Sequence, residues 1–279
     1  MTDILDLGFL HGPIMLFGGP YSNLEATQAA KTQAERMGID PHHCLCTGDV
    51  VAYGADPKAT VDLVRSWGIH VVQGNCEQAL AQNAEHCGCG FELGSTCAAL
   101  SEQWYPHANN NLDITRRKWM GALPRLIRFQ YAEKSVSVIH GGVEHSNQFV
   151  FASTNAEEKK RQTNAIRADV IVAGHAGLPF THTLDNGAIW HNAGAIGLPA
   201  NDGTPDTWFS LLSETANGLM LTHHRLPYDH QKSASRMRQE GLVEGYAKAL
   251  ECGLWPSLDV LPAAERALGG NPSSLPTLL

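Results

Sequence analysis

The chain has 279 residues, a formal net charge of −8, 43% hydrophobic residues and 17% charged residues. These proportions are those of a globular protein rather than a disordered one, and the acidic balance argues against binding to the phosphate backbone of nucleic acids. The longest apolar runs, residues 13–17 and 170–173 among them, are far too short to cross a bilayer, so no membrane contact is expected.

The length predicts one large α/β unit rather than two domains. We expect a single domain over residues 1–279, with a core at about 12–230 and a helical tail at 231–279. Asp3 and Asp6 stand where a secretory signal would carry Lys or Arg, which argues against export. Seven cysteines, an odd number, favour reduced thiols over a disulfide framework, so a cytoplasmic protein is expected.

In the first third of the chain, short apolar runs alternate with helical stretches. We expect strands at 13–17, 43–47 and 69–73, separated by helices at 23–37 and 57–67. This order predicts parallel strands joined by crossovers and buried on both faces.

The later elements are expected to be more mixed. They comprise a helix at 115–123, strands at 135–139 and 170–173, and a more antiparallel section that begins at 188–192. Strands at 208–213 and 219–225 flank Asn217-Gly218 and predict a hairpin. Residues 231–250 are expected to be helical and residues 272–279 to be loose.

Polar or glycine-rich residues follow each predicted strand directly. The junctions are Gly18-Gly19, Gly48-Asp49, Gly74-Asn75, His140-Gly141-Gly142, Gly174-His175 and Asn192-Ala193-Gly194. Ligand sites in open α/β sheets form beyond the carboxyl ends of strands. Turn formation explains the glycines but not the acid, amide and imidazole groups beside them.

Four of these side chains form a candidate metal site. Asp49, Asn75, His140 and His175 offer two oxygens and two imidazoles, a set that suits Mn, Fe, Zn or Co better than Ca or Mg. Taken alone, each has a simpler explanation, since an Asp after a strand is often a cap or turn residue. Together they predict a bound divalent transition metal, expected to be Mn, Fe or Zn.

The junctions resemble the motifs of the calcineurin-like metallophosphoesterases, which carry D-x-H, GD, GNH followed by an acid, H and GHxH at strand ends. Further stretches resemble the small bacterial branch related to diadenosine tetraphosphatases: residues 23–26, 53–57, 174–180, 192–197 and 226–229. The resemblance covers most of the chain in the right order. It implies a four-layer α-β-β-α sandwich with mixed sheets and a metal-dependent phosphoesterase, a hydrolase.

The chain departs from this family pattern at one of the two metal positions. Gly19-Pro20-Tyr21 replaces the first Asp and His, Cys76 replaces the histidine of the third motif, and Gly177 replaces the last histidine. In the family, the first-motif pair and the last histidine build one metal position. The ligands of the other position are all present, so we expect one ion per chain, with two as the alternative.

The resemblance also suggests further site residues. Tyr21 is expected to bind a phosphate oxygen or a metal, or to fill the space of the absent ion. Cys76 stands where the family has its general acid, and it is expected to be a metal ligand, an acid or nucleophile, or a buried filler. Glu77, the acid that follows the third motif, and Asn192, in the stretch 192–197, are expected to contact the substrate. Cys87 and Cys89, with Cys76 and Cys97 nearby, are candidates for a lid over the metal.

Three functions are compatible with these residues. The first is a phosphoesterase acting on a small phosphorylated molecule or nucleotide. The second is an iron-dependent redox enzyme or other non-phosphatase with thiol participation, because Asp49, His140 and His175 form the two-histidine, one-carboxylate set of non-haem iron sites. The third is a catalytically silent binding protein, suggested by the missing ligands.

Overall fold

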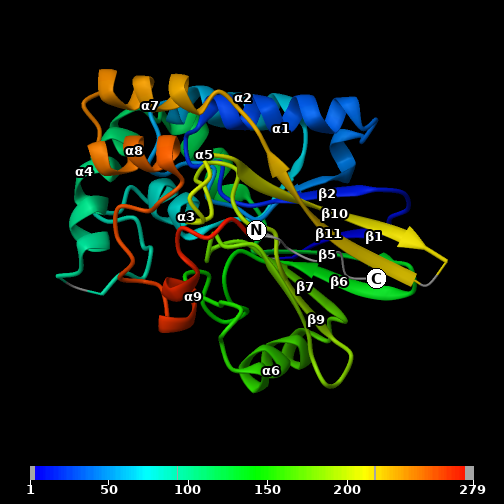
Figure 1. Cartoon of the computed structure of the whole chain (residues 1–279). Helices are drawn as coiled ribbons and strands as arrows, with labels where there is room; N and C mark the ends of the chain where they lie inside the picture. Colours follow the sequence, from blue (N-terminus) through cyan, green and yellow to red (C-terminus); the bar gives the residue numbers. More distant parts are fainter. Residues whose placement is uncertain (1–3, 93, 217, 274–279) are drawn as a thin grey trace.

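Two mixed β-sheets pack face to face, with helices on the outer side of each (Figure 1). The computed structural model describes residues 4–92, 94–216 and 218–273. The six-stranded sheet runs in the order β1 (Ile4–Phe9), β5 (Leu126–Tyr131), β6 (Lys134–Val138), β7 (Val170–Ala173), β9 (Ile189–Asn192) and β8 (Phe180–Thr183). The five-stranded sheet runs β11 (Gly218–Leu226), β10 (Thr207–Thr215), β2 (Ile14–Phe17), β3 (Cys44–Cys46) and β4 (His70–Val71).

The three early strands are parallel, as predicted from the alternation of apolar and helical stretches. β2 pairs with β3 in the register Met15↔Cys44, and β3 pairs with β4. β10 pairs with β11 in the predicted antiparallel hairpin and closes the sheet against β2. Asn217, expected in the turn of that hairpin, lies outside the described residues.

Alternate side chains of the early strands serve two separate cores. Ile14, Leu16 and Leu45 lie between the sheets, against Phe129 and Val138 of the other sheet. The intervening residues of β2 and β3 face the helices instead; they are Met15, Phe17, Cys44 and Cys46. This period of two explains why every residue of β2 is buried. Each fully buried large apolar side chain contributes about 1.5–3 kcal/mol to folding.

Helices cover the outer faces of both sheets. α1 (Leu24–Arg36), α2 (Pro57–Trp67) and α7 (His230–Gln239) lie on the five-stranded sheet, and α6 (Ala156–Ile166) lies below the six-stranded one (Figure 1). The predicted α-β-β-α sandwich is therefore confirmed. α1 begins where the Asn23 side chain accepts a hydrogen bond from the Ala26 N–H, which satisfies one of the free donors of the first turn.

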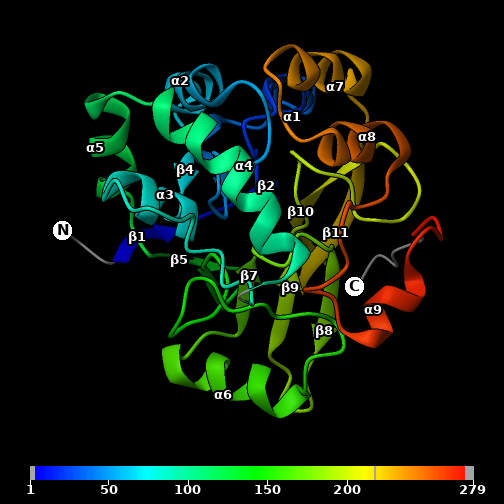
Figure 2. The same ribbon diagram turned by 90° about the vertical axis from the view of Figure 1, so that its left-hand side faces the viewer.

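The other helices gather at one end of the sandwich (Figure 2). They are α3 (Asn75–Ala81), α4 (Thr96–Asn110), α5 (Ile114–Ala122), α8 (Glu244–Cys252) and α9 (Ala263–Leu268). A short 3-10 turn at Pro41–His43 directly precedes β3. No helix within the three described ranges is long and apolar enough to span a membrane.

The prediction of helix across residues 231–250 is wrong at its centre. The chain leaves the helical conformation after Gln239, and Gly241 adopts a φ of +69° before α8 begins. Glycine reaches this left-handed conformation at little cost, so it ends α7 and lets α8 turn back. Of the tail expected to be loose, residues 274–279 lie outside the described residues.

Candidate metal centre

The structure brings the four predicted ligands together at the carboxyl ends of the strands. Asp49 follows β3, Asn75 opens α3 after β4, and His140 and His175 follow β6 and β7. The His140 Nε2 atom lies 3.0 Å from Asn75 Oδ1, 3.0 Å from His175 Nδ1 and 3.2 Å from Asp49 Oδ2. Each of the four side chains is at most 7% exposed. Their role as metal ligands stays a prediction.

The hydrogen bonds around this cluster leave its inward atoms without donors. His140 donates its Nδ1–H to the Thr47 carbonyl at 2.7 Å, which leaves a lone pair on Nε2. Asn75 donates its Nδ2–H to the Cys87 carbonyl at 3.1 Å, so its Oδ1 faces the cluster. The acceptor atoms His140 Nε2, Asn75 Oδ1 and Asp49 Oδ2 therefore face one another, with Nε2 at 3.0 Å from Oδ1 and 3.2 Å from Oδ2. This arrangement fits a site built for a cation. Asp49, His140 and His175 each offer one ligand atom, and these atoms lie within 4.8 Å of one another.

The electrostatics of the cluster agree with this. Burial alone would raise the pKa of Asp49, but the neighbouring His140 and His175 lower it overall. Burial would lower the pKa of His140, but the charge of Asp49 outweighs burial and raises it. Burial keeps the pKa of His175 below its ordinary value. Without a metal, a proton on His140 can therefore neutralise Asp49, and metal and proton compete for the same position.

Glu77 supports the backbone of this site. Its Oε2 accepts hydrogen bonds from the N–H groups of Asp49 at 2.7 Å and Gly74 at 2.9 Å, and its Oε1 accepts from Val50 at 2.8 Å. The side chain is fully buried, and burial together with the charge of Asp49 raises its pKa to about 7. These bonds hold the loop of Asp49 against the start of α3. The expected contact between Glu77 and substrate stays a prediction.

Asn192 also binds backbone. Its Oδ1 accepts a hydrogen bond from the Gly194 N–H at 3.0 Å, and the side chain is 1% exposed. This bond shapes the loop after β9, in which Gly194 has a φ of +76°. The contact with substrate predicted for Asn192 stays a prediction as well.

Tyr21 occupies the side of the site where ligands are missing. Its ring lies over Gly19, where a Cβ atom would fall 2.1 Å from the ring carbon Cζ. Its hydroxyl lies 3.9 Å from the place of a Cβ on Gly177. The side chain is 5% exposed, and burial raises its pKa well above the ordinary value. Tyr21 thus fills space between the two glycines, and its predicted role toward phosphate or metal stays open to test.

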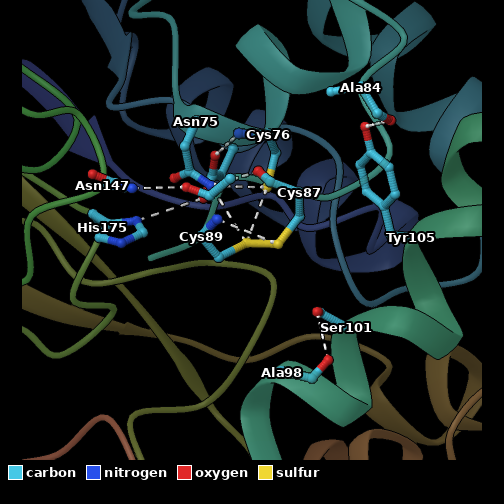
Figure 3. Close-up of a disulfide and its surroundings, with 12 residues drawn as sticks. Asn75, Cys76, Ala84, Cys87, Cys89, Ala98, Ser101, Tyr105, Asn147 and His175 are labelled. Atoms are coloured by element: carbon cyan, nitrogen blue, oxygen red, sulfur yellow. Dashed lines mark hydrogen bonds and ion pairs between the residues drawn. A yellow bond between two sulfur atoms is a disulfide. The ribbon is translucent and has the colours of Figure 1, made fainter. Parts of the chain in front are cut away.

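A disulfide joins Cys87 and Cys89 beside the cluster (Figure 3). The expectation of reduced thiols is wrong for this pair, because the two cysteines lie two residues apart on a tight loop and their side chains meet. The other five cysteines are free: Cys44, Cys46, Cys76, Cys97 and Cys252. The loop lies over Asn75, whose Nδ2 contacts the Cys87 carbonyl and the Cys89 Sγ at 3.4 Å. It therefore has the position expected for a lid.

Cys76 lies directly behind this loop. Its N–H donates to Asp49 Oδ1 at 3.1 Å, and its Sγ is 4.0 Å from Cys89 Sγ. The side chain is 1% exposed, and burial, followed by the charges of Asp49 and Glu77, raises the pKa of the thiol. The thiol is therefore protonated in the metal-free protein.

Sequence reasoning missed the aromatic groups around the site. Phe149 lies against His175 with 4.3 Å between ring centroids, and Trp255 of the C-terminal tail approaches Gly177 to within 3.6 Å of a Cβ placed there. These residues come from loops without a local motif. Only the density of aromatic residues in the loops could have pointed to them.

The comparisons with known proteins agree with the fold. Residues 10–250 match the family model described as calcineurin-like phosphoesterase. An uncharacterised protein of Methanocaldococcus jannaschii is 23% identical over 247 residues, covering 84% of this chain and 95% of its own. A metallophosphoesterase from Sphaerobacter thermophilus superposes with a TM-score of 0.68 at 22% identity, covering 88% of this chain and 100% of its own.

A hypothetical protein from Pyrococcus horikoshii superposes with a TM-score of 0.73 at 15% identity, covering 87% of this chain and 99% of its own. At such low sequence identities the superpositions show the fold alone, whereas the family model matches most of the chain. The resemblance inferred from the strand-end motifs is confirmed, and the chain belongs to the calcineurin-like phosphoesterases.

Proposed function

We propose that the protein is a metal-dependent phosphoesterase that hydrolyses a small phosphorylated molecule and uses one divalent transition metal, Mn, Fe or Zn, per chain. Asp49, Asn75, His140 and His175, which we call the metal quartet, would hold the ion. The observation that carries this proposal is the convergence of three acceptor atoms. His140 Nε2 lies 3.2 Å from Asp49 Oδ2 and 3.0 Å from Asn75 Oδ1.

In the proposed reaction the metal would activate water, and the protein side chains would hold the ligands in orientation. A bound ion of this kind lowers the pKa of water to roughly 7 and offsets charge on a phosphoryl group. Hydrolysis then joins the oxygen of water to phosphorus and breaks the bond from phosphorus to the ester oxygen, which leaves with a proton as an alcohol or phenol. His140 and Asn75 are held in orientation by Thr47 and Cys87, so little reorganisation is needed when substrate binds.

Tyr21 and Cys76 are the chain's own candidates for contacts with the reacting group. The raised pKa of Tyr21 keeps its hydroxyl protonated, so it is a hydrogen-bond donor to a phosphate oxygen. The thiol of Cys76 is likewise protonated, which fits a proton donor or a packing residue better than a nucleophile. Cys76→Ser keeps a donor and Cys76→Ala removes it, so the kcat values of the two variants separate these roles.

The substrate class follows from charge and architecture. A net charge of −8 disfavours nucleic-acid backbones, so we propose a small phosphorylated molecule as the partner. Two loops line the pockets beside Asn75 and His175, and we propose that they contribute to selectivity; their lining residues are Ala84, His86, Gly88, Phe91, residues 144–147 and Phe149.

The test is metal content together with turnover. Protein purified without added metal is analysed for its elements, then assayed on nitrophenyl mono- and diesters with Mn, Fe or Zn. We expect about one ion per chain, and a loss of activity of roughly a hundredfold or more in Asp49→Asn. Exposed Asp229→Asn is the matched control. Bound metal without turnover of any ester would contradict the proposal, and iron with a thiol-sensitive signal would favour the redox alternative.

A further inference from the structure

A pocket lined by aromatic rings adjoins the candidate metal centre. His175 and Gly177 belong to its lining, and its cavity volume is about 50 Å³, within about 530 Å³ of empty space that includes the adjoining open solvent. Six aromatic side chains surround it and define what we call the aromatic pocket: Tyr21, Tyr53, Phe91, Phe149, Tyr246 and Trp255. They come from three loops that follow strands, from the loop between α3 and α4, from α8 and from the C-terminal tail.

The chemistry of the lining selects against a second charged group. Among the described residues that line the aromatic pocket there is no Lys, Arg, Asp or Glu. The surface of the lining is mostly apolar, although Ser257 and the three tyrosines each carry a hydroxyl. A phosphate or carboxylate placed here would lose its hydration without gaining an opposite charge, whereas a neutral ring would be stabilised by burial and by ring–ring contacts.

The walls of the aromatic pocket are held in place before any ligand binds. Tyr53 stacks on Tyr246 with 4.5 Å between centroids and meets Tyr21 edge-on at 4.9 Å. Trp255 donates its Nε1–H to the Pro199 carbonyl at 2.6 Å, and its backbone N–H donates to Asn201 Oδ1 at 2.8 Å. A preformed site of this kind requires little ordering on binding, so apolar contact is converted into affinity efficiently.

The aromatic pocket shares His175 with the candidate metal centre. His175 belongs both to the metal quartet, with Nδ1 at 3.0 Å from His140 Nε2, and to the wall of the aromatic pocket. A phosphoester whose phosphorus lies at the quartet would therefore have one ester substituent directed into the rings. A substituent without apolar surface would leave the pocket hydrated.

We infer that the aromatic pocket binds an apolar aryl group of the substrate, so that the preferred phosphoester carries an aryl substituent beside the metal centre. The ring-binding part stands on the pocket alone, and the link to hydrolysis rests on the proposed function. The mostly apolar surface of the lining favours a neutral hydrocarbon ring over a nucleobase.

Binding is measured first, with 2-naphthol and metal-free protein, so that turnover is not required. We expect saturable quenching of tryptophan fluorescence, weakened roughly tenfold or more in Ser257→Trp, which places a ring inside the pocket. Trp255→Ala, which removes a wall, should weaken binding as well. Leu254→Trp is the matched control, because it adds the same ring on the same tail at a side chain that is 43% exposed.

Turnover is measured second, with two 4-nitrophenyl phosphodiesters whose other ester is phenyl or methyl. In both, water adds to phosphorus and 4-nitrophenolate leaves, so only the second substituent differs. We expect kcat/KM to favour phenyl by roughly tenfold, and Ser257→Trp to abolish that preference. Naphthol binding without hydrolysis of either diester would overturn the proposed function and leave the pocket assignment standing. Equal turnover of both diesters without naphthol binding, or tighter binding of adenosine than of naphthol, would overturn the pocket assignment.

Discussion

The ring of Tyr21 lies so close over Gly19 that the two positions must change together. A Cβ atom on residue 19 would fall 2.1 Å from Tyr21 Cζ and 2.5 Å from two further ring carbons. An aspartate at residue 19, the residue type of the family's first motif, is therefore sterically incompatible with Tyr21 in this position. The absence of an aspartate at residue 19 and the presence of this tyrosine therefore belong to one packing arrangement.

This relationship predicts the behaviour of Gly19→Asp. The clash with the Tyr21 ring and the φ of +34° should lower the free energy of unfolding by about 2–4 kcal/mol, measured by denaturant titration. The double variant Gly19→Asp/Tyr21→His should recover part of that loss. Gly12→Asp is the control, because Gly12 also has a positive φ, +77°, but nothing lies within 4 Å of its Cβ position. Equal losses in the two single variants would show that the ring clash is not the cause.

Glu77→Gln tests how the loop of Asp49 is held. The carboxylate of Glu77 accepts three backbone N–H groups, and an amide would turn its own N–H₂ toward at least one of them. We expect the free energy of unfolding to fall by about 2–3 kcal/mol and manganese affinity to fall with it. Exposed Glu102→Gln should change neither quantity. Unchanged metal affinity in Glu77→Gln would mean that these bonds do not position Asp49.

The disulfide over Asn75 predicts a redox effect on metal binding. The Cys87 carbonyl and the Cys89 Sγ both accept from Asn75 Nδ2, so reduction, or Cys89→Ser, loosens the orientation of this amide. Isothermal titration should show a loss of manganese affinity of roughly tenfold, as for other groups that orient a ligand. Cys252→Ser, a free cysteine on α8, should have no effect. Identical affinities for oxidised and reduced protein would contradict this role of the loop.

A stacked pair of histidines, of which His191 is buried and His223 is partly buried, predicts acid sensitivity. His191 and His223 stack with 4.5 Å between centroids, and burial, followed by the charge of His224, lowers the pKa of His223 to about 4. The unfolded chain therefore binds more protons than the folded one between about pH 4 and 6.5, so stability rises with pH across that window.

The loss on acidification from His223 alone should reach up to about 3 kcal/mol, measured by urea unfolding at successive pH values. His223→Gln, which keeps a hydrogen-bonding group near Ser210 and Thr181, should flatten this part of the profile. A variant profile as steep as that of the wild type would assign the acid sensitivity to other groups.

The sequence predicted those parts of the site that depend on local pattern. Asp49, Asn75, His140 and His175 each follow an apolar strand and a glycine-rich turn, so their meeting follows from the topology of parallel strands. β1 was not predicted because five of its six residues are exposed, which leaves no alternation of apolar and polar residues to recognise. The break between α7 and α8 had a signal in Gly241, and the run of good helix formers around it masked that signal.

The remainder of the site depends on contacts between distant segments. The Phe149 ring on His175 and the Trp255 ring near Gly177 join stretches separated by 26 and 78 residues, and no local motif marks them. The Cys87–Cys89 bond could be recognised only once the loop was seen to turn back on itself. Packing of this kind is decided by the whole fold rather than by residue type.

The most direct test is the anomalous diffraction of manganese in crystals grown with that ion. A single peak within coordination distance of Asp49, Asn75, His140 and His175, with Tyr21 still over Gly19, is the predicted result. An absence of density at the quartet, or a second peak of equal height between Tyr21 and Gly177, would contradict a centre built for one ion.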